Sequence, residues 1–173
     1  PYDEGFTGPD MVKRALAAYF GSVSFLDHNV GRVLDALEAA GLSDSTRVIY
    51  GSDHGENLGA RGLWAKSTLF EESAGIPLIM AGPDVPEHRV IKEPVSLVDV
   101  FPTVLECVGV ERAKEDADLP GMSLLEAAQG KLPKRTVLSE YHAVASPSGS
   151  FMIRRWRFKY IYYCGYSPML FDL

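Results

Sequence analysis

Cysteine, long hydrophobic runs and net positive charge are scarce or missing in this chain of 173 residues. Its two cysteines, Cys107 and Cys164, stand at unrelated spacings, which excludes a disulfide framework and a cysteine-based zinc pattern. No apolar stretch approaches the roughly 20 residues that span a bilayer, so no membrane-spanning segment is expected. The formal net charge of −6 argues against nucleic acid or an anionic membrane as the main partner.

The order of the apolar patterns predicts an α/β fold with one hydrophobic core. Apolar residues recur at helical spacing after Asp10, which is placed to cap the helix, and Gly41 is placed to end it. Ser96 and Asp99 form a capping-box pattern, and the helix that follows is expected to end at Gly109. Apolar runs predict strands at 47–50, 76–80 and 136–140, and an antiparallel hairpin with its basic residues facing solvent at 151–163.

The most informative residues follow the strand at 47–50, where Gly51 breaks the apolar run and Asp53 and His54 come next. Ligands of open α/β sheets bind outside the carboxyl ends of the strands. A carboxylate beside an imidazole supplies an oxygen and a nitrogen ligand for one divalent cation. The alternative is a turn in which Asp53 only caps the following segment, since Asp and Gly are common turn residues.

These residues and several segments around them resemble the sulfatase branch of the alkaline phosphatase superfamily, which includes arylsulfatases, choline sulfatases and phosphonate monoester hydrolases. The strongest match is the block from Ser52 to Glu56, followed by Gly62-Leu63-Trp64 and Lys66. Further matching segments lie at residues 19–37, 77–83, 95–103, 121–125 and 170–173. The resemblance therefore covers nearly the whole chain.

The resemblance implies roles for three side chains. Asp53 and His54 match the positions that hold one divalent metal ion, which is Ca²⁺ or, because imidazole suits borderline ions better, Mn²⁺ or Zn²⁺. Lys66 matches the lysine that contacts the sulfate or phosphate oxygens, so Lys66 and His54 are the candidate catalytic residues. A fixed ammonium there stabilises charge that grows on the ester as its bond breaks. Outside this motif, Lys66 would be interpreted as a solvated surface lysine.

Two departures from the family pattern affect this inference. Many relatives carry an acidic residue and a histidine before Gly-Leu-Trp, where this chain has Ala60 and Arg61. Arg61 is therefore expected to contact the substrate, a nearby carboxylate or only solvent. The nucleophile is also missing, because no cysteine or serine stands in the Cys/Ser-x-Pro-x-Arg segment that yields formylglycine, and the paired aspartates of the family's metal site are absent.

From these absences we expect the chain to be a C-terminal portion of a longer hydrolase. Its formylglycine would form from a cysteine or serine upstream, and its main partner would be the missing N-terminal part of the same fold. One carboxylate and one imidazole are too few for an ion that takes six or more ligands, so the segment alone is expected to bind metal weakly and not to turn over.

The resemblance also implies the fold, an alkaline-phosphatase-like sandwich of a mainly parallel sheet flanked by helices, followed by the start of a small antiparallel C-terminal subdomain. Residues 1–135 are then expected to belong to the α/β domain and residues 136–173 to the subdomain. His142, which follows the strand at 136–140, is a candidate for substrate contact, and the alternative is a structural histidine.

Three functions remain open from the sequence. The first is metal-dependent hydrolysis of sulfate esters, to which the chain contributes two metal ligands and an oxyanion-binding lysine. The second is hydrolysis of phosphonate monoesters or phosphodiesters by the same family of sites. The third is a non-catalytic remnant that binds a partner or an anion. For an enzyme the substrate would be a small anionic ester, and assembly into a homo-oligomer is left open.

Overall fold

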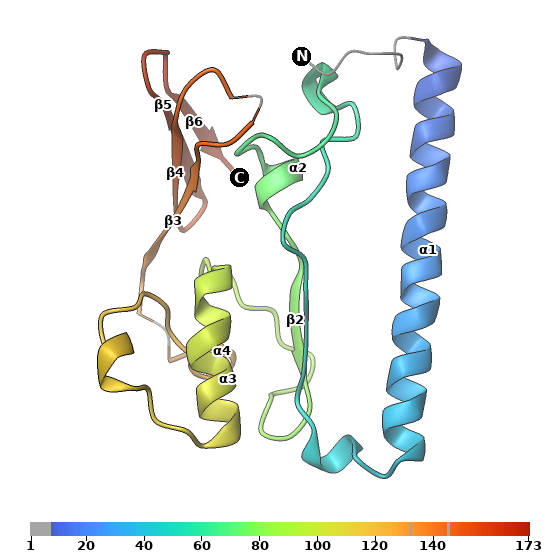
Figure 1. The fold of residues 1–173 in the computed structure, drawn as a ribbon, viewed down its shortest axis with the longest axis vertical. Coiled ribbons are helices and arrows are strands. Elements are labelled where there is room, and N and C mark those ends of the chain that lie inside the picture. Colours follow the sequence, from blue (N-terminus) through green and yellow to red (C-terminus); the bar gives the residue numbers. More distant parts are fainter. Residues whose placement is uncertain (1–7, 132, 145) are drawn as a thin grey trace. The chain divides into compact units, whose positions relative to one another are not determined.

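The computed structural model describes residues 8–131, 133–144 and 146–173 (Figure 1). The chain divides into two compact units, unit 1 ending at Pro83 and unit 2 beginning at Asp84. The expected boundary between residues 135 and 136 stays a prediction. Among the described residues, no helix combines the length and the hydropathy that crossing a bilayer requires.

Unit 1 begins with the long helix α1 (Pro9–Ala39). Proline suits this first position because its missing amide hydrogen would have no partner inside the helix. The residue before the helix is Gly8, so Asp10 is not the cap that the sequence suggested; it lies in the first turn, where a carboxylate favours the positive helix end. Gly41 ends the helix as predicted, with a φ of +69° and an amide that bonds back to the last turn. None of the residues of α1 is buried.

The remainder of unit 1 contains two strands, β1 (Val48–Gly51) and β2 (Leu78–Ala81), which lie where the sequence predicted strands. They pair antiparallel, with Gly51 opposite Leu78, and both sheets of the described residues are antiparallel. The parallel strands that we expected are therefore not found there, because an apolar run indicates a strand but not its direction. Three short helices complete the unit: η1 (Ser43–Ser45), η2 (Ala60–Gly62) and α2 (Glu71–Ala74).

A capped helix follows the opening loop of unit 2. The predicted capping box is confirmed, since the amide of Ser96 donates to the Asp99 carboxylate and the Ser96 side chain meets the backbone of the first turn. The turn η3 (Leu97–Asp99) leads into α3 (Val100–Val108), and Gly109 ends α3 with a φ of +69°. Two further short helices follow, η4 (Lys114–Asp116) and α4 (Leu124–Ala128).

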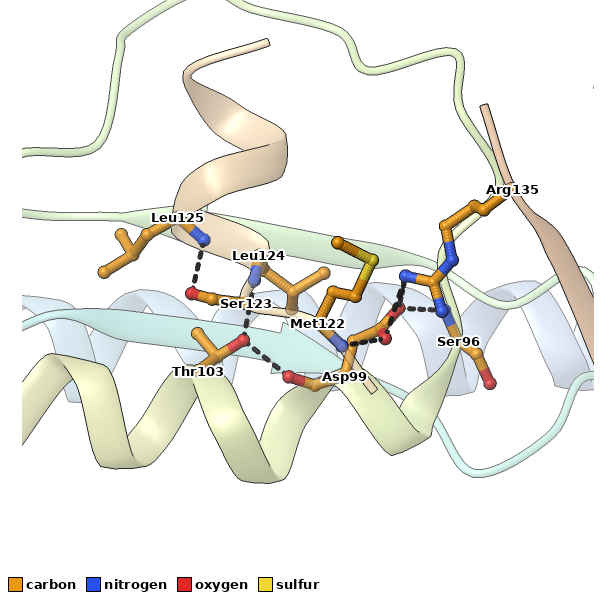
Figure 2. A network of polar contacts seen from close by, with 8 residues as sticks. All are labelled: Ser96, Asp99, Thr103, Met122, Ser123, Leu124, Leu125 and Arg135. Atoms are coloured by element: carbon orange, nitrogen blue, oxygen red, sulfur yellow. Dashed lines mark hydrogen bonds and ion pairs between the residues drawn. The ribbon is translucent and has the colours of Figure 1, made fainter. Parts of the chain in front are cut away.

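A buried polar network joins α3 to α4 (Figure 2). The side chain of Asp99 is fully buried and accepts hydrogen bonds from the amide of Met122 at 2.9 Å and from the guanidinium of Arg135 at 3.0 Å. The hydroxyl of Thr103 donates to the backbone oxygen of Asp99 and accepts from the amide of Leu124 at the start of α4. These contacts satisfy buried polar groups and fix α4 and the residue before β3 to one end of α3.

The end of unit 2 is a four-stranded antiparallel sheet in the order β3-β4-β5-β6. The predicted strand and hairpin are confirmed as β3 (Thr136–Tyr141), β4 (Ser150–Arg155) and β5 (Phe158–Tyr163), and β6 (Met169–Asp172) pairs with β5. Val137, Met152 and Ile161 alternate onto one buried face. Lys159 lies on this face too and is only 2% exposed, so the expectation that the basic residues of the hairpin face solvent is wrong for Lys159.

Candidate active site

The candidate residues of unit 1 lie in the loop that follows β1. Ser52 comes directly after the strand, and its hydroxyl donates to the backbone oxygen of His54 at 2.7 Å. The Asp53 carboxylate accepts a hydrogen bond from the amide of His54 at 3.0 Å. Such short-range bonds are typical of tight turns that begin with serine or aspartate. Asp53 therefore makes, through Oδ1, the local turn contact that we gave as the alternative to metal binding. The other carboxylate oxygen, Oδ2, takes no part in this turn contact.

The partners of the two ring nitrogens define the state of His54. Its Nδ1 lies 2.9 Å from the backbone oxygen of Gly55, and a carbonyl oxygen only accepts, so this nitrogen carries the hydrogen. In the neutral ring, Nε2 is then an acceptor, and the Nζ of Lys66 lies 2.6 Å from it. The Oδ2 of Asp53 lies 3.4 Å from the same nitrogen. The structure thus brings together the carboxylate, the imidazole and the ammonium.

The electrostatics of this group favour an ionised carboxylate. Desolvation is the largest single influence and raises the pKa of Asp53, but the hydrogen bonds from backbone amides and the electrostatic attraction of His54 and Lys66 together outweigh it. The pKa of Asp53 consequently lies below its ordinary value. The loop thus presents a carboxylate oxygen, a ring nitrogen and an ammonium group to the same region.

A divalent ion fits Asp53 and His54 as two of its ligands. Neighbouring ligands of one ion lie about 3 Å apart when each bond is roughly 2.1–2.4 Å long, and Oδ2 and Nε2 are separated by 3.4 Å. In the part of the chain that the structure describes, no group of three or more His, Cys, Asp or Glu side chains could hold a metal ion. Asp53 and His54 would therefore supply two of the ligands that such an ion needs, and Nζ of Lys66 lies 2.6 Å from the ring nitrogen that the ion would use.

Two side chains that sequence reasoning did not assign a role hold the Lys66 segment in place. Glu56 accepts a hydrogen bond from the amide of Ala65 at 2.5 Å, and the Asn57 side-chain amide donates to the backbone oxygen of Ala65 at 2.6 Å. Asn57 is 1% exposed. Glu56 belongs to the Ser52–Glu56 block that carries the family resemblance. Asn57 could be recognised only by its burial, which a single sequence does not reveal.

The other two candidates each contact a carboxylate. The guanidinium of Arg61 lies 2.6 Å from Glu72 and 4.7 Å from the ring centroid of Phe70, so of the three expected partners the nearby carboxylate is the one observed. His142 belongs to unit 2, where its Nε2 lies 3.0 Å from the carboxylate of Glu140. Substrate binding by Arg61 and by His142 stays a prediction.

Comparison with known proteins places the chain among sulfatases. Residues 1–110 match the Sulfatase family, and residues 59–173 match the family described as N-sulphoglucosamine sulphohydrolase, C-terminal. A choline-sulfatase of Rhizobium meliloti (strain 1021) is 39% identical over 95% of this chain and 32% of its own length. Human arylsulfatase K is 33% identical over 94% of this chain and 32% of its own length.

A solved structure matches the fold along nearly the whole chain. The phosphonate monoester hydrolase from Silicibacter pomeroyi superposes with a TM-score of 0.84 and 28% identity, over 98% of this chain and 37% of that one. The chain thus spans about a third of the length of the curated relatives that it matches. With the family matched over most of its residues and the fold matched throughout, this chain belongs to the sulfatase family of the alkaline phosphatase superfamily.

Proposed function

We propose that the whole protein, meaning this chain together with the rest of the sulfatase fold, hydrolyses sulfate esters of small anionic substrates. In this proposal Asp53 and His54 are ligands of one divalent metal ion, and Lys66 binds the ester oxygens. The main support is the convergence of the three side chains, with Nζ of Lys66 2.6 Å and Oδ2 of Asp53 3.4 Å from Nε2 of His54. A lysine side chain has about 2 kcal/mol of rotamer entropy, so a surface lysine has no general reason to adopt this position.

The chemistry assigns a distinct task to each residue. When bound, the metal ion, which is Ca²⁺, Mn²⁺ or Zn²⁺, would polarise the ester oxygens as a Lewis acid, and a formylglycine from outside these residues would supply the nucleophile. Asp53 offers an ionised oxygen, and the bond from Nδ1 of His54 to Gly55 keeps the lone pair of Nε2 directed outward from that carbonyl. Lys66 would donate hydrogen bonds to the ester or leaving oxygen as negative charge grows there.

The remaining parts of the site would come from residues outside this chain. The curated relatives are about three times as long, and a complete site needs more metal ligands than the two found among the described residues. The parallel strands of the expected sandwich would belong to the same additional residues. The natural partner of this segment is therefore the rest of its own fold.

Hydrolysis of phosphonate monoesters or phosphodiesters is the second candidate function. The likeness to a phosphonate monoester hydrolase, with a TM-score of 0.84, favours it. His54 favours it as well, because an imidazole ligand suits manganese or zinc better than calcium. Sulfate remains the first candidate, since both curated relatives described above are sulfatases.

A substrate panel tests this proposal. The whole protein is assayed with an aryl sulfate, an aryl phosphonate monoester and a phosphodiester, and its metal content is measured by mass spectrometry. We expect the highest kcat/KM for the sulfate ester and loss of activity after chelation. A preference for the phosphonate by orders of magnitude would support the second candidate. No turnover of any of the three esters would contradict both and favour a non-catalytic binding module.

A further inference from the structure

The loop that leads to Lys66 has a strained backbone. Three residues other than glycine adopt positive φ values: Leu58 at 50°, Arg61 at 56° and Ala65 at 62°. Such conformations cost of order 1–3 kcal/mol each and persist only where surrounding contacts enforce them, most often at functional sites. The contacts that enforce the conformation of Ala65, the residue before Lys66, can be identified.

Ala65 is held on both sides of its backbone. Its amide donates to Oε1 of Glu56 at 2.5 Å. Its carbonyl oxygen accepts two hydrogen bonds from Asn57, one from the backbone amide at 2.9 Å and one from Nδ2 at 2.6 Å. Glu56 and Asn57 follow His54 closely in the sequence, so the residues next to the imidazole hold the residue next to the lysine.

Asn57 also holds the segment beyond Lys66. Its Oδ1 accepts a hydrogen bond from the hydroxyl of Thr68 at 3.2 Å, so its side chain contacts residues on both sides of the lysine. Burial of an amide without hydrogen-bond partners costs several kcal/mol. The buried side chain of Asn57 avoids this cost because it forms hydrogen bonds with the segment around Lys66. The carbonyl oxygen of Lys66 itself accepts from the hydroxyl of Ser73 and from the amide of Thr68.

We propose that Glu56 and Asn57 are positioning residues that hold the Lys66 ammonium against the imidazole of His54. The inference rests on the proposed function of Lys66, because it names the residues that place this group. Lys66 is exposed and its side chain is long, so a fixed backbone at Ala65 is what limits the positions that Nζ reaches. A misplacement of about 1 Å can reduce catalysis by about 100-fold.

A double-mutant cycle in the whole protein tests this proposal by kinetics. We expect Asn57→Ala to lower kcat by about 100-fold with little change in KM. In the Lys66→Ala background, the same substitution should lower kcat further by less than about threefold. Asn29→Ala on helix α1 is the matched control, since the hydrogen bonds of the Asn29 side chain, to Phe25 and Arg32, both stay within α1. Equal effects of Asn57→Ala in the two backgrounds would show a general structural role and overturn the proposal.

A pair of substitutions separates positioning from charge at Glu56. Glu56→Gln keeps an oxygen that accepts from the amide of Ala65, whereas Glu56→Ala removes it. We expect the alanine variant to lose about ten times more kcat than the glutamine variant. Equal losses in the two variants would assign the effect to the charge of Glu56 and contradict a positioning role. If Asn57→Ala unfolds the protein, Thr68→Val is the milder variant that removes one of the bonds to Asn57.

A measurement on the chain itself distinguishes this inference from the proposed function, because it requires no activity. The side-chain ¹H–¹⁵N resonances of His54 report the contact between Nε2 and the Lys66 ammonium. We expect Lys66→Ala to shift them, Asn57→Ala to shift them in the same direction, and Asn29→Ala to leave them in place. Unchanged His54 signals in Asn57→Ala would overturn the positioning role even in an active enzyme. If the His54 signals shift in Asn57→Ala but Lys66→Ala retains the parent activity, the positioning role holds and the proposed function is wrong.

Discussion

The Nζ of Lys66 lies 2.6 Å from the Nε2 of His54, and the same nitrogen lies 3.4 Å from Oδ2 of Asp53. The ammonium therefore occupies the position that a metal ion would take on this imidazole. Removal of its charge should strengthen metal binding by the isolated chain.

We expect Lys66→Ala to tighten Mn²⁺ binding to the 173-residue chain by roughly 30-fold. A divalent ion and a unit charge 4 Å apart in water repel each other by about 2 kcal/mol, which corresponds to this factor. Asp53→Asn should weaken binding, and Lys13→Ala on helix α1 should leave it unchanged. Titration followed by electron paramagnetic resonance of free Mn²⁺ measures all three. Equal affinity of the Lys66→Ala variant and the parent chain would contradict the arrangement.

The titration of Asp53 provides a second test. Its pKa lies below the ordinary value of 3.8, with the charge of Lys66 among the causes that lower it. A lowered pKa in the fold means that the carboxylate stabilises the folded chain above the unfolded pKa, and that this contribution is lost as pH falls through the folded pKa. The side chain is 82% exposed, so the effect on stability is small and the titration itself is the better measurement.

By carboxyl ¹³C NMR, we expect a midpoint for Asp53 below 3.8 in the parent chain and a higher midpoint in Lys66→Ala. Lys13→Ala serves again as the control and should not move it. A midpoint above 3.8 in the parent chain would show that desolvation outweighs the backbone hydrogen bonds and the attraction of His54 and Lys66.

The buried ion pair of unit 2 carries a prediction about stability. The Asp99 side chain is fully buried and the Arg135 side chain is 14% exposed, with their atoms 3.0 Å apart. Arg135→Ala leaves a buried carboxylate without its cation and should lower the free energy of unfolding of unit 2 by about 3 kcal/mol.

Urea denaturation measures this loss, and hydrogen exchange at the amides of Met122 and Leu124 locates it in the network (Figure 2). Arg155→Ala, at an exposed position of β4, is the matched control and should change stability by less than about 1 kcal/mol. Similar losses in the two variants would show that the ion pair with Asp99 has no special structural role.

Local patterns in the sequence predicted the elements that depend on local contacts. The capping box of Ser96 and Asp99 and the helix ends at Gly41 and Gly109 all formed, because each involves residues only a few positions apart. The sequence block from Asp53 to Lys66 likewise indicated a compact group of side chains, and the structure brings its three candidates together.

Features that depend on distant contacts could not be predicted in this way. The direction in which β1 and β2 pair is not encoded in either apolar run. Alternation in the hairpin identified two faces but not which one faces solvent, so Lys159 was assigned to the wrong face. The positions of Glu56 and Asn57 against Ala65 follow from the path of the loop, which only the structure shows.

The most direct test of the central claim is the activity of Lys66→Ala in the whole protein. We predict that kcat/KM for an aryl sulfate falls by about 100-fold or more, the scale of one lost charge contact in the transition state, while Lys13→Ala retains the parent value. An activity within about threefold of the parent would contradict the assignment of Lys66 and of the site built around it.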